Sequence, residues 1–385
     1  MKVLGLILEA NPLHNGHIYF INKAKELVKP DVVIAVTSTY FSMRGDISVI
    51  NKFDKTNLLL QSGIDIVLEL PFTSTNASAD YFSYNAVKTL VDMKVTDIVF
   101  GSECDSINEL RELQKLDEYL GNSSEVKSNL SKGYSYSTST FKALSNYSND
   151  LDLINKFALP NNTLGIQYLN AIDKLNKDIN VQIIKRIDNN YYDNEINNAI
   201  ASATALRTKL FNNESIDEFV PFKVSYIDIN EAENNLYHLF QYKLLSTDIN
   251  EIKEIHGIKE GIENRLISFI DSTNYQEFIK NVETKRYTKS YIKRIILNII
   301  LGLKKTNQLV SHLRILGMNQ QGKKYIGKLD KETKEKLITN IKDIDSELIK
   351  YELLSSKIYG IILNSSSIYK EEYKLPIILK GEKDA

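Results

Sequence analysis

The chain has 385 residues, of which 43% are hydrophobic and 25% charged, and its formal net charge is −1. This length is sufficient for two domains, and the composition excludes a disordered or collagen-like chain. The single cysteine, Cys104, excludes an internal disulfide and is typical of a reducing compartment.

No targeting or membrane segment is expected. The apolar run before Glu9 is too short for the core of a signal peptide. The longest later apolar run, residues 295–303, is interrupted by Asn298 and is too short to cross a membrane. We therefore expect a cytoplasmic protein with no membrane partner.

The first predicted elements are a strand, a turn and a helix. Residues 3–8 form an apolar run typical of a buried parallel strand. Hydrophobic residues then recur at helical spacing until Pro30 ends the helix. In the turn between them, the free backbone N–H groups at the helix start favour an anion. Gly16 lets a phosphate approach the backbone there closely.

Two histidines in this turn are candidate catalytic residues. His14 and His17 are three positions apart, so both can donate a hydrogen bond to one group that gains negative charge. This suits attack at the α-phosphate of a nucleotide, where catalysis depends mostly on positioning and charge stabilisation. The alternative is a capped turn with two surface histidines. A zinc site is less favoured, because no third His or Cys lies nearby at ligand spacing.

Short apolar runs continue to alternate with helical patterns. We predict strands over 31–36, 64–70, 97–100 and 181–186, helices over 52–62, 81–93 and 107–119, and a helix that begins near 160. This alternation predicts right-handed βαβ crossovers and a parallel sheet. Residues 122–150 are rich in Ser, Asn and Tyr, and we expect a helix with long loops there.

Ligands bind at the carboxyl ends of parallel strands, so the loops at these ends hold further candidates. Arg44, in the loop that follows the second strand, is a candidate phosphate or RNA contact, with a solvated arginine as the equal alternative. Gly101 ends a strand where a base or ribose can approach. Asn161 and Asn162 start a helix, and one of them can cap it while the other binds a nucleotide.

A second phosphate-binding element is predicted around residues 200–207. Ser202 or Thr204 can cap a helix, and Arg207, one turn later, can reach an anion held at its N-terminus. A capped surface helix with a solvated arginine is the alternative. Arg186, at the basic end of the last predicted strand, is expected at the same edge of the sheet.

The strand and helix alternation stops near residues 219–226, which predicts one domain over 1–225 and a second, mainly helical one over 226–385. Residues 281–328 of the second domain include eleven basic residues and one acidic residue, Glu283; the basic ones are Lys285, Arg286, Lys289, Lys293, Arg294, Lys304, Lys305, Arg314, Lys323, Lys324 and Lys328. Such segregation indicates contact with a phosphate backbone, and Tyr287, Tyr291 and Tyr325 could stack on unpaired bases. A solvated helix face is the alternative.

The turn at residues 9–17 resembles the signature of the HIGH-type nucleotidyltransferase superfamily, which adenylylates substrates on a Rossmann-like sheet. Residues 201–207 resemble the superfamily's Ile-Ser-Ser-Thr-x-x-Arg motif, with Ala203 as a departure. More of the chain resembles one family, the bacterial tRNA(Met) cytidine acetate ligases. The stretches that carry this resemblance are 9–17, 44–46, 100–103, 160–162, 185–186, 201–207, 284–288 and 313–317, with departures at Ala10, Leu13, Met43 and Ile47.

The resemblance implies an α/β fold, with a Rossmann-like nucleotidyltransferase domain followed by a mainly α-helical, tRNA-binding domain. It also implies an enzyme that makes acetyl-adenylate and pyrophosphate from acetate and ATP. The acetyl group is then transferred to N4 of the wobble cytidine, position 34, of elongator tRNA(Met). Mg²⁺ is expected as a charge partner of the triphosphate.

The site residues implied by the resemblance fall into three sets. His14 and His17 are catalytic. The ATP-binding set is Ile7, Leu8, Glu9, Ala10, Asn11, Pro12, Leu13, Asn15, Gly16, Ile18, Tyr19, Phe20, Gly101, Asn161, Asn162, Arg186, Ile187, Ser202, Thr204 and Arg207. The tRNA-binding set is Arg44, Lys285, Arg286, Lys289, Lys293, Arg294 and Arg314. Two alternatives stay open, namely a small-molecule adenylyltransferase of cofactor biosynthesis and a non-catalytic RNA-binding protein.

Overall fold

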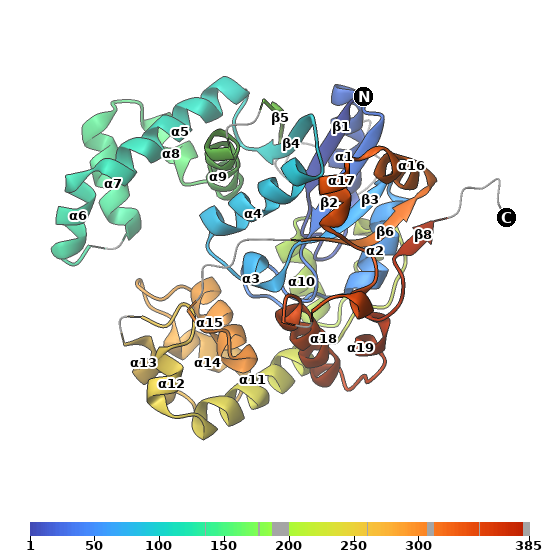
Figure 1. The fold of residues 1–385 in the computed structure, drawn as a ribbon. Helices are drawn as coiled ribbons and strands as arrows, with labels where there is room; N and C mark the ends of the chain where they lie inside the picture. Colours follow the sequence, from blue (N-terminus) through green and yellow to red (C-terminus); the bar gives the residue numbers. More distant parts are fainter. Residues whose placement is uncertain are drawn as a thin grey trace.

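A computed structural model describes residues 1–134, 136–175, 178–186, 200–259, 261–305, 312–345 and 347–379. Among these residues a mixed sheet of eight strands forms the centre of the molecule (Figure 1). The strands are β1 (Val3–Ile7), β2 (Val32–Thr37), β3 (Ile66–Glu69), β4 (Asp97–Ser102), β5 (Asn180–Lys185), β6 (Leu313–Asn319), β7 (Leu337–Ile338) and β8 (Ile377–Leu379).

Five parallel strands in the order β5-β4-β1-β2-β3 make up the part of the sheet that the sequence predicted. The chain runs outward from β1 through β2 to β3, and it then crosses back to place β4 on the other side of β1. The carboxyl ends of β1 and β4 therefore flank the point where the direction of winding reverses, which is where open α/β sheets bind ligands. The predicted Rossmann-like arrangement is confirmed.

The helices of the first half cover both faces of the sheet. They are α1 (Asn15–Val28), α2 (Lys52–Gln61), α3 (Phe72–Thr75), α4 (Ala79–Asp92), α5 (Ile107–Asn122), α6 (Ser124–Ser131), α7 (Tyr136–Tyr147), α8 (Leu151–Phe157), α9 (Pro160–Leu175) and α10 (Ala203–Phe211). The predicted helices agree with these bounds to within a few residues. The exception is 122–150, which forms successive short helices rather than one helix with long loops, because Ser123 and Asp150 cap new helices.

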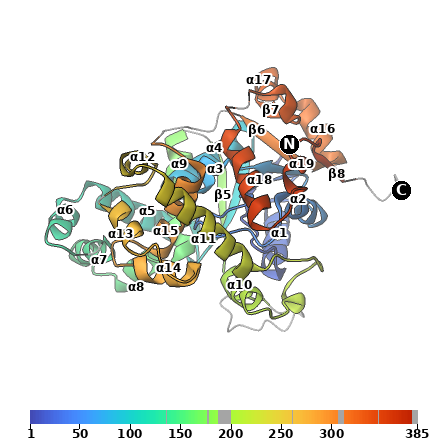
Figure 2. The ribbon, with the colours of Figure 1, turned by 90° about the horizontal axis from the view of Figure 1, so that it is seen from below.

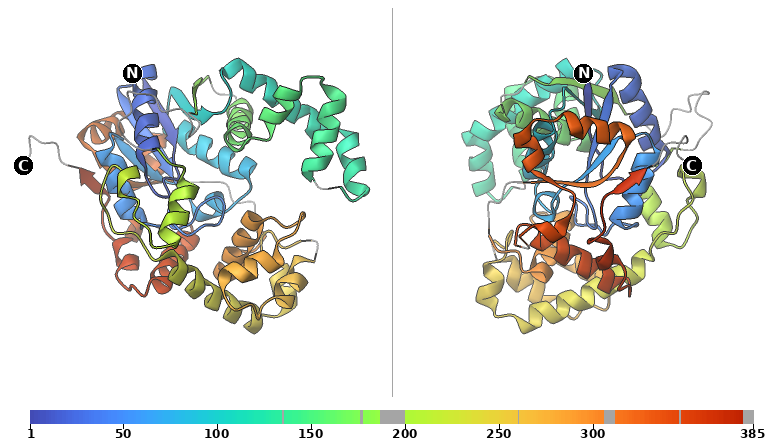
Figure 3. Two further views of the ribbon diagram at one scale, coloured as in Figure 1. Left: turned by 180° about the vertical axis from the view of Figure 1, so that it is seen from behind. Right: turned by 45° about the vertical axis from the view of Figure 1, so that its right-hand side comes forward.

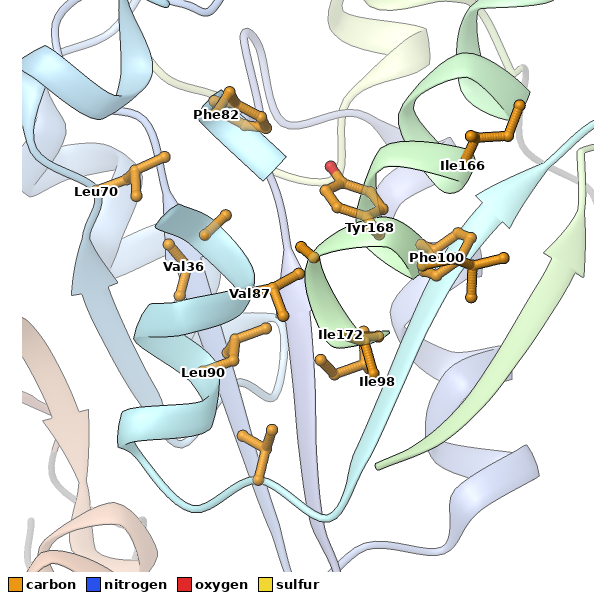
Figure 4. Close-up of a cluster of buried hydrophobic side chains, with 14 of the residues drawn as sticks. Val36, Leu70, Phe82, Val87, Leu90, Ile98, Phe100, Ile166, Tyr168 and Ile172 are labelled. Carbon is orange, nitrogen blue, oxygen red and sulfur yellow. The ribbon is translucent and has the colours of Figure 1, made fainter. Parts of the chain in front are cut away.

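Alternating side chains of the strands explain why both faces are covered. In β2, Val33 and Ala35 pack in the cluster that includes α1 and α2, whereas Ile34 and Val36 pack in the cluster that includes α4 and α9. Figure 4 shows the second cluster, in which side chains of α4 and α9 meet those of β2 and β4. Continuous burial on both faces is the usual environment of parallel strands.

The second half contains a helical unit with its own core. Its helices are α11 (Ile229–Ser246), α12 (Ile249–Lys253), α13 (Ile262–Ser268), α14 (Tyr275–Val282) and α15 (Lys289–Leu301), which lie together in Figure 2. Tyr40, Phe41 and Ile47, from the loop after β2, are buried in the same core. The sheet and the helical unit are therefore joined through an apolar contact.

The chain then returns to the sheet, which corrects one expectation. Strand β6 pairs antiparallel with β3, with Ile66 opposite Met318, and β8 pairs with β6; Figure 3 shows these orange and red segments beside the blue strands. Residues 313–319 and 377–379 thus belong to the sheet, although the sequence assigned them to a mainly helical domain. The division at residue 225 stays a prediction.

Short helices complete the second half. These are α16 (Gln320–Lys328), α17 (Lys331–Glu335), α18 (Lys350–Ile362) and α19 (Ile368–Glu371), with 3-10 turns at Asp217–Phe219 and Ile341–Asp343. None of the helices in the described part of the chain has the length and apolar character needed to cross a membrane.

Candidate nucleotide-binding site

A cavity of about 250 Å³ opens at the carboxyl ends of β1 and β4. Its walls come from the turn before α1, from β4 and β5, and from the starts of α9 and α10. Phe82, Phe100 and Tyr168, which are labelled in Figure 4, line it where the core of the sheet ends. The cavity thus lies at the point where the fold predicts a ligand.

The turn with the two histidines forms one wall of the cavity. His14 is the N-cap of α1, and its backbone N–H donates to Nδ1 of His17 over 3.3 Å. The two ring centroids are 3.9 Å apart. Because Nδ1 of neutral His17 accepts a hydrogen bond, its proton is on Nε2. A Cβ on Gly16 would lie 2.9 Å from the His14 ring, so this position must be glycine for the ring to pack there.

Both imidazoles are neutral near pH 7. Burial, together with the nearby charges of Arg186 and Arg207, lowers the pKa of His14 to about 4. Burial, the neighbouring His14 and the charge of Arg186 hold the pKa of His17 well below its usual value. The Nδ1 atom of His14 is buried and makes no hydrogen bond. Both residues line the cavity, and each neutral ring carries one N–H that can donate to a bound anion.

Asn161 and Arg186 lie on the opposite wall. Nη1 of Arg186 donates to Oδ1 of Asn161 over 3.2 Å, and both residues line the cavity. Glu103 accepts the backbone N–H of Asn162 over 2.8 Å and so caps α9. The side chain of Asn162 is fully buried and accepts from Ser102 over 2.6 Å. Asn162 therefore shapes the loop after β4 and does not line the cavity, in contrast to its predicted contact with the nucleotide.

The second predicted phosphate element begins helix α10, and Ser202 is its N-cap. Arg207 points back toward the histidine turn, where its Nη1 donates to the Asn11 carbonyl over 2.8 Å. Its Nη2 lies 3.3 Å from both Asp46 Oδ2 and Thr204 Oγ1. The two motifs, which are nearly 200 residues apart in the sequence, are thus brought together by one guanidinium.

The loop after β2 joins this site to α15. Gly45 has φ +78°, and a Cβ there would lie 2.7 Å from Cβ of Lys293, so the loop approaches α15 more closely than another residue would allow. Asp46 accepts from Lys293 Nζ over 2.8 Å on one oxygen and from Arg207 on the other. Burial opposes ionisation of Asp46, but these two cations outweigh it and hold its pKa below the usual range.

The remaining residues of the predicted ATP set divide into three groups. Ile7, Leu8, Glu9, Tyr19, Phe20 and Gly101 line the cavity. Ala10, Asn11, Pro12 and Leu13 are buried and form the turn itself. Asn15 and Ile18 face away from the cavity, toward residues 217–221. Ile187 lies outside the described residues.

Several residues that line the cavity were not among the predicted site residues. Met43, Leu164, Tyr168 and Ile184 line the cavity, and they resemble ordinary core residues in the sequence. Lys55 is buried below the turn, where it donates to the carbonyls of Glu9, Ser38 and Thr39 over 3.0 to 3.2 Å. Burial lowers the pKa of Lys55 to about 8. These contacts tie the ends of β1 and β2 together.

Residues 1–374 match the family described as HIGH Nucleotidyl Transferase. The chain is 34% identical to the tRNA(Met) cytidine acetate ligase of Thermosipho africanus, with 99% of this chain and 100% of that protein covered. It is 32% identical to the ligase of the same name from Oceanobacillus iheyensis, with 98% and 100% covered. The chain belongs to the HIGH nucleotidyltransferases and, within them, to the tRNA(Met) cytidine acetate ligases. The family resemblance seen in the sequence is confirmed.

A solved structure of this family has the same fold. The chain superposes on Thermotoga maritima TmcAL bound with alpha-thio ATP with a TM-score of 0.84 and 27% identity, over 99% of this chain and 100% of that one. The apo form of the same protein gives the same TM-score of 0.84 with 28% identity.

The cations that were predicted to contact RNA do not all lie on one surface of this family member. Arg44, Lys285, Arg286 and Lys289 are exposed. Lys293 and Arg294 are half-buried, and Nη1 of Arg294 donates to the Met43 carbonyl over 3.3 Å. Lys323 and Lys324 lie on α16, which is across the molecule from α15 (Figure 1). The basic segment is therefore divided between two places.

Arg314 and Tyr325 are corrections to the predicted RNA surface. Arg314 is only 6% exposed, and its guanidinium pairs with Glu69 over 2.8 Å and with Glu372 over 2.6 Å. Tyr325 is buried and donates to the Met93 carbonyl over 2.7 Å. Both side chains are parts of the packed interior, so neither can contact RNA.

The donor set around the cavity does not fit a resident magnesium ion. The described residues contain no group of three or more His, Cys, Asp or Glu that could hold a metal, and Asp46 is already paired with two cations. Mg²⁺ prefers oxygen ligands and is usually held by few carboxylates and by substrate phosphates. A magnesium ion at this site would have to be held mainly by the phosphates of a bound nucleotide.

Proposed function

We propose that the protein is an ATP-dependent acetate ligase that forms acetyl-adenylate and acetylates N4 of the wobble cytidine, position 34, of elongator tRNA(Met), giving N4-acetylcytidine. The observation that carries this proposal is the pair of buried, neutral histidines at the carboxyl end of β1 in a chain of this family. Because ATP and tRNA are cytoplasmic, we expect the protein to act in the cytoplasm.

In the first step a carboxylate oxygen of acetate attacks the α-phosphorus of ATP, and the bond to the β-phosphate breaks to release pyrophosphate. His14 and His17 donate N–H bonds to the α-phosphate oxygens as their charge rises. Ser202, Thr204 and Arg207 hold the β- and γ-phosphates at the start of α10. No protein nucleophile is required, since positioning and charge stabilisation carry the reaction.

In the second step the N4 amine attacks the acetyl carbonyl carbon, the bond to AMP breaks, and one amine proton is lost. Two carboxylates near the nucleotide cavity, Glu9 and Glu103, are available to accept this proton. Glu103 is bonded to the N-terminus of α9, whereas Glu9 lines the cavity and burial raises its pKa. We therefore propose that Glu9 accepts the amine proton, because a carboxylate with a higher pKa is a stronger base.

The decisive experiment combines two assays of the full chain. Wild-type protein should support acetate-dependent exchange between ATP and pyrophosphate, and it should transfer radiolabelled acetate to one cytidine of unmodified tRNA(Met). We expect alanine at both His14 and His17 to lower exchange by about 10²- to 10³-fold, because two donors to the α-phosphate are lost. Exchange that survives the double substitution would contradict the proposal. His238→Ala, an exposed histidine of α11, is the matched control.

A second variant separates this function from its alternatives. The double substitution Lys285→Glu and Arg286→Glu should weaken tRNA binding and leave the exchange reaction intact. Both residues are exposed, and neither lines the nucleotide cavity. A small-molecule adenylyltransferase would not respond to this change in any assay. A non-catalytic RNA-binding protein would show no exchange even as wild type.

A further inference from the structure

A second cavity, of about 420 Å³, lies between the sheet and the helical unit. The sheet side contributes Arg44, Thr204 and Arg207, and helix α15 contributes Lys289, Ser290 and Lys293. The cavity is thus lined by cations and hydroxyl groups from both halves of the chain. The adenylylation step described so far uses no residue of α15.

The two cavities adjoin each other at two points of the chain. Met43 lines the nucleotide cavity and the next residue, Arg44, lines the second one. Ser202 lines the first and Thr204 the second, within the first turn of α10. A triphosphate whose α-phosphate lies at the histidines and whose end is held by Thr204 and Arg207 therefore points into the second cavity.

The charges of the second cavity favour an anion. Four cationic residues line it, namely Arg44, Arg207, Lys289 and Lys293, against the two acidic residues Asp46 and Glu233. Asp46 already accepts from two of these cations, and Glu233 is buried and bonded to Gln276. The surplus of positive charge is therefore not cancelled by the acidic residues.

Arg44 and Lys289 are the two cations best able to move toward a ligand. Arg44 is exposed on the loop after β2. The side chain of Lys289 is 63% exposed and forms a long ion pair of 3.7 Å with Glu283, which is weak at such exposure. By contrast, Lys293 and Arg207 are held by Asp46.

We propose that the second cavity is a pyrophosphate site, in which Arg44 and Lys289 bind the diphosphate that leaves ATP. The inference rests on the proposed function, because that function supplies the pyrophosphate. It makes α15 a part of the adenylylation site as well as of the predicted RNA surface. Pyrophosphate and tRNA then share Lys289, so the diphosphate must leave before the RNA can use this contact.

The test measures the binding of inorganic pyrophosphate to the full chain by calorimetry in the presence of Mg²⁺. We expect Arg44→Met and Lys289→Met each to weaken pyrophosphate about tenfold, the effect of one charge-assisted contact. The affinity for AMP should not change. Lys285→Met is the matched control, since Lys285 is exposed in the same segment but does not line the cavity.

The outcomes separate this inference from the proposed function. Unchanged pyrophosphate affinity in both variants, no binding to the wild type, or an equal loss of AMP affinity would each overturn the site. If the wild type shows no acetate-dependent exchange but both variants bind pyrophosphate more weakly than the wild type, the pyrophosphate site is supported and the proposed ligase function is wrong. If the wild type shows exchange and both variants bind pyrophosphate as tightly as the wild type, the ligase function is supported and the pyrophosphate site is wrong.

Discussion

Two networks of ion pairs join the sheet to the second half of the chain, and they differ in their access to solvent. In the first, Lys52 and Arg314 pair with Glu69 and Glu372 over 2.6 to 2.9 Å, and no side chain is more than 6% exposed. In the second, Asp46 pairs with Arg207 and Lys293, each 16 to 19% exposed.

Both networks pair a lysine and an arginine with carboxylates, so their surroundings decide what each can do. The first is closed by Tyr40, whose hydroxyl donates to Glu372 over 2.7 Å. In the second network, Asp46 and Arg207 line the second cavity. Residues close to them in the sequence line the nucleotide cavity. A network that is buried away from solvent can only stabilise the fold, whereas the residues of a network beside a cavity can exchange ion-pair partners when an anion binds.

The largest effect should come from breaking the dry network. Glu372→Ala leaves Lys52 and Arg314 with a single carboxylate, and we expect it to lower the free energy of unfolding by about 3 to 5 kcal/mol. Urea denaturation measures this loss. Lys323→Met, on the exposed surface of α16, should change stability by less than about 0.5 kcal/mol. A loss below about 1 kcal/mol in Glu372→Ala would show that the network is not structural.

Acid titration separates the buried network from the histidine turn, because the two lose their contributions to stability in different pH ranges. The folded pKa of His14, about 4, lies below its unfolded value of 6.5, so the unfolded chain binds the extra proton and stability falls as pH drops from 6.5 to 4. This loss amounts to at most about 3 kcal/mol. Burial opposes ionisation of Glu372, but Lys52 and Arg314 lower its pKa to about 2, so its contribution is lost only below pH 4.5.

Unfolding measured across pH checks this separation. His14→Gln should reduce the slope of the stability profile between pH 6.5 and 4, where His17 supplies a further part of the slope, and leave the acid limb below pH 4 unchanged. If the variant keeps the full slope of the wild type above pH 4, the buried imidazole is not its source.

The smallest stability change should come from the open network, where the effect appears in ATP binding instead. Asp46→Asn should alter the free energy of unfolding by no more than about 1 kcal/mol. It should raise the KM for ATP in exchange about tenfold, because Arg207 loses the partner that orients it. Asp80→Asn, an exposed carboxylate of α4, is the control. Tighter ATP binding in Asp46→Asn would instead mean that the carboxylate competes with phosphate.

Local patterns were sufficient to predict most of the nucleotide-binding half. The apolar run of β1, the helical spacing of α1 and the glycine between the two histidines are features of adjacent residues, and the structure contains all three. The capping role of Ser202 and the approach of Arg207 were also predicted. Such features depend on neighbours in the sequence, which is why they are visible there.

Partners that are distant in the sequence account for what was missed. Arg314 looked like one more cation in a basic segment, because nothing near it shows that Glu69 and Glu372 surround it. Likewise, Asp46 is separated by 161 residues from Arg207 and by 247 from Lys293. The buried strand β6 went unrecognised for the same reason, since its partner β3 is distant in the sequence.

The pairing of β6 with β3 bears on how the protein can be divided. A fragment that stops at residue 225 would keep the histidine turn and α10 but lose both β6 and β8. The backbone N–H and C=O groups of β3 would then face solvent along an apolar edge, which is a template for self-association. Expression of the nucleotide-binding half alone should therefore yield aggregates, and fragments should be designed to retain the returning strands.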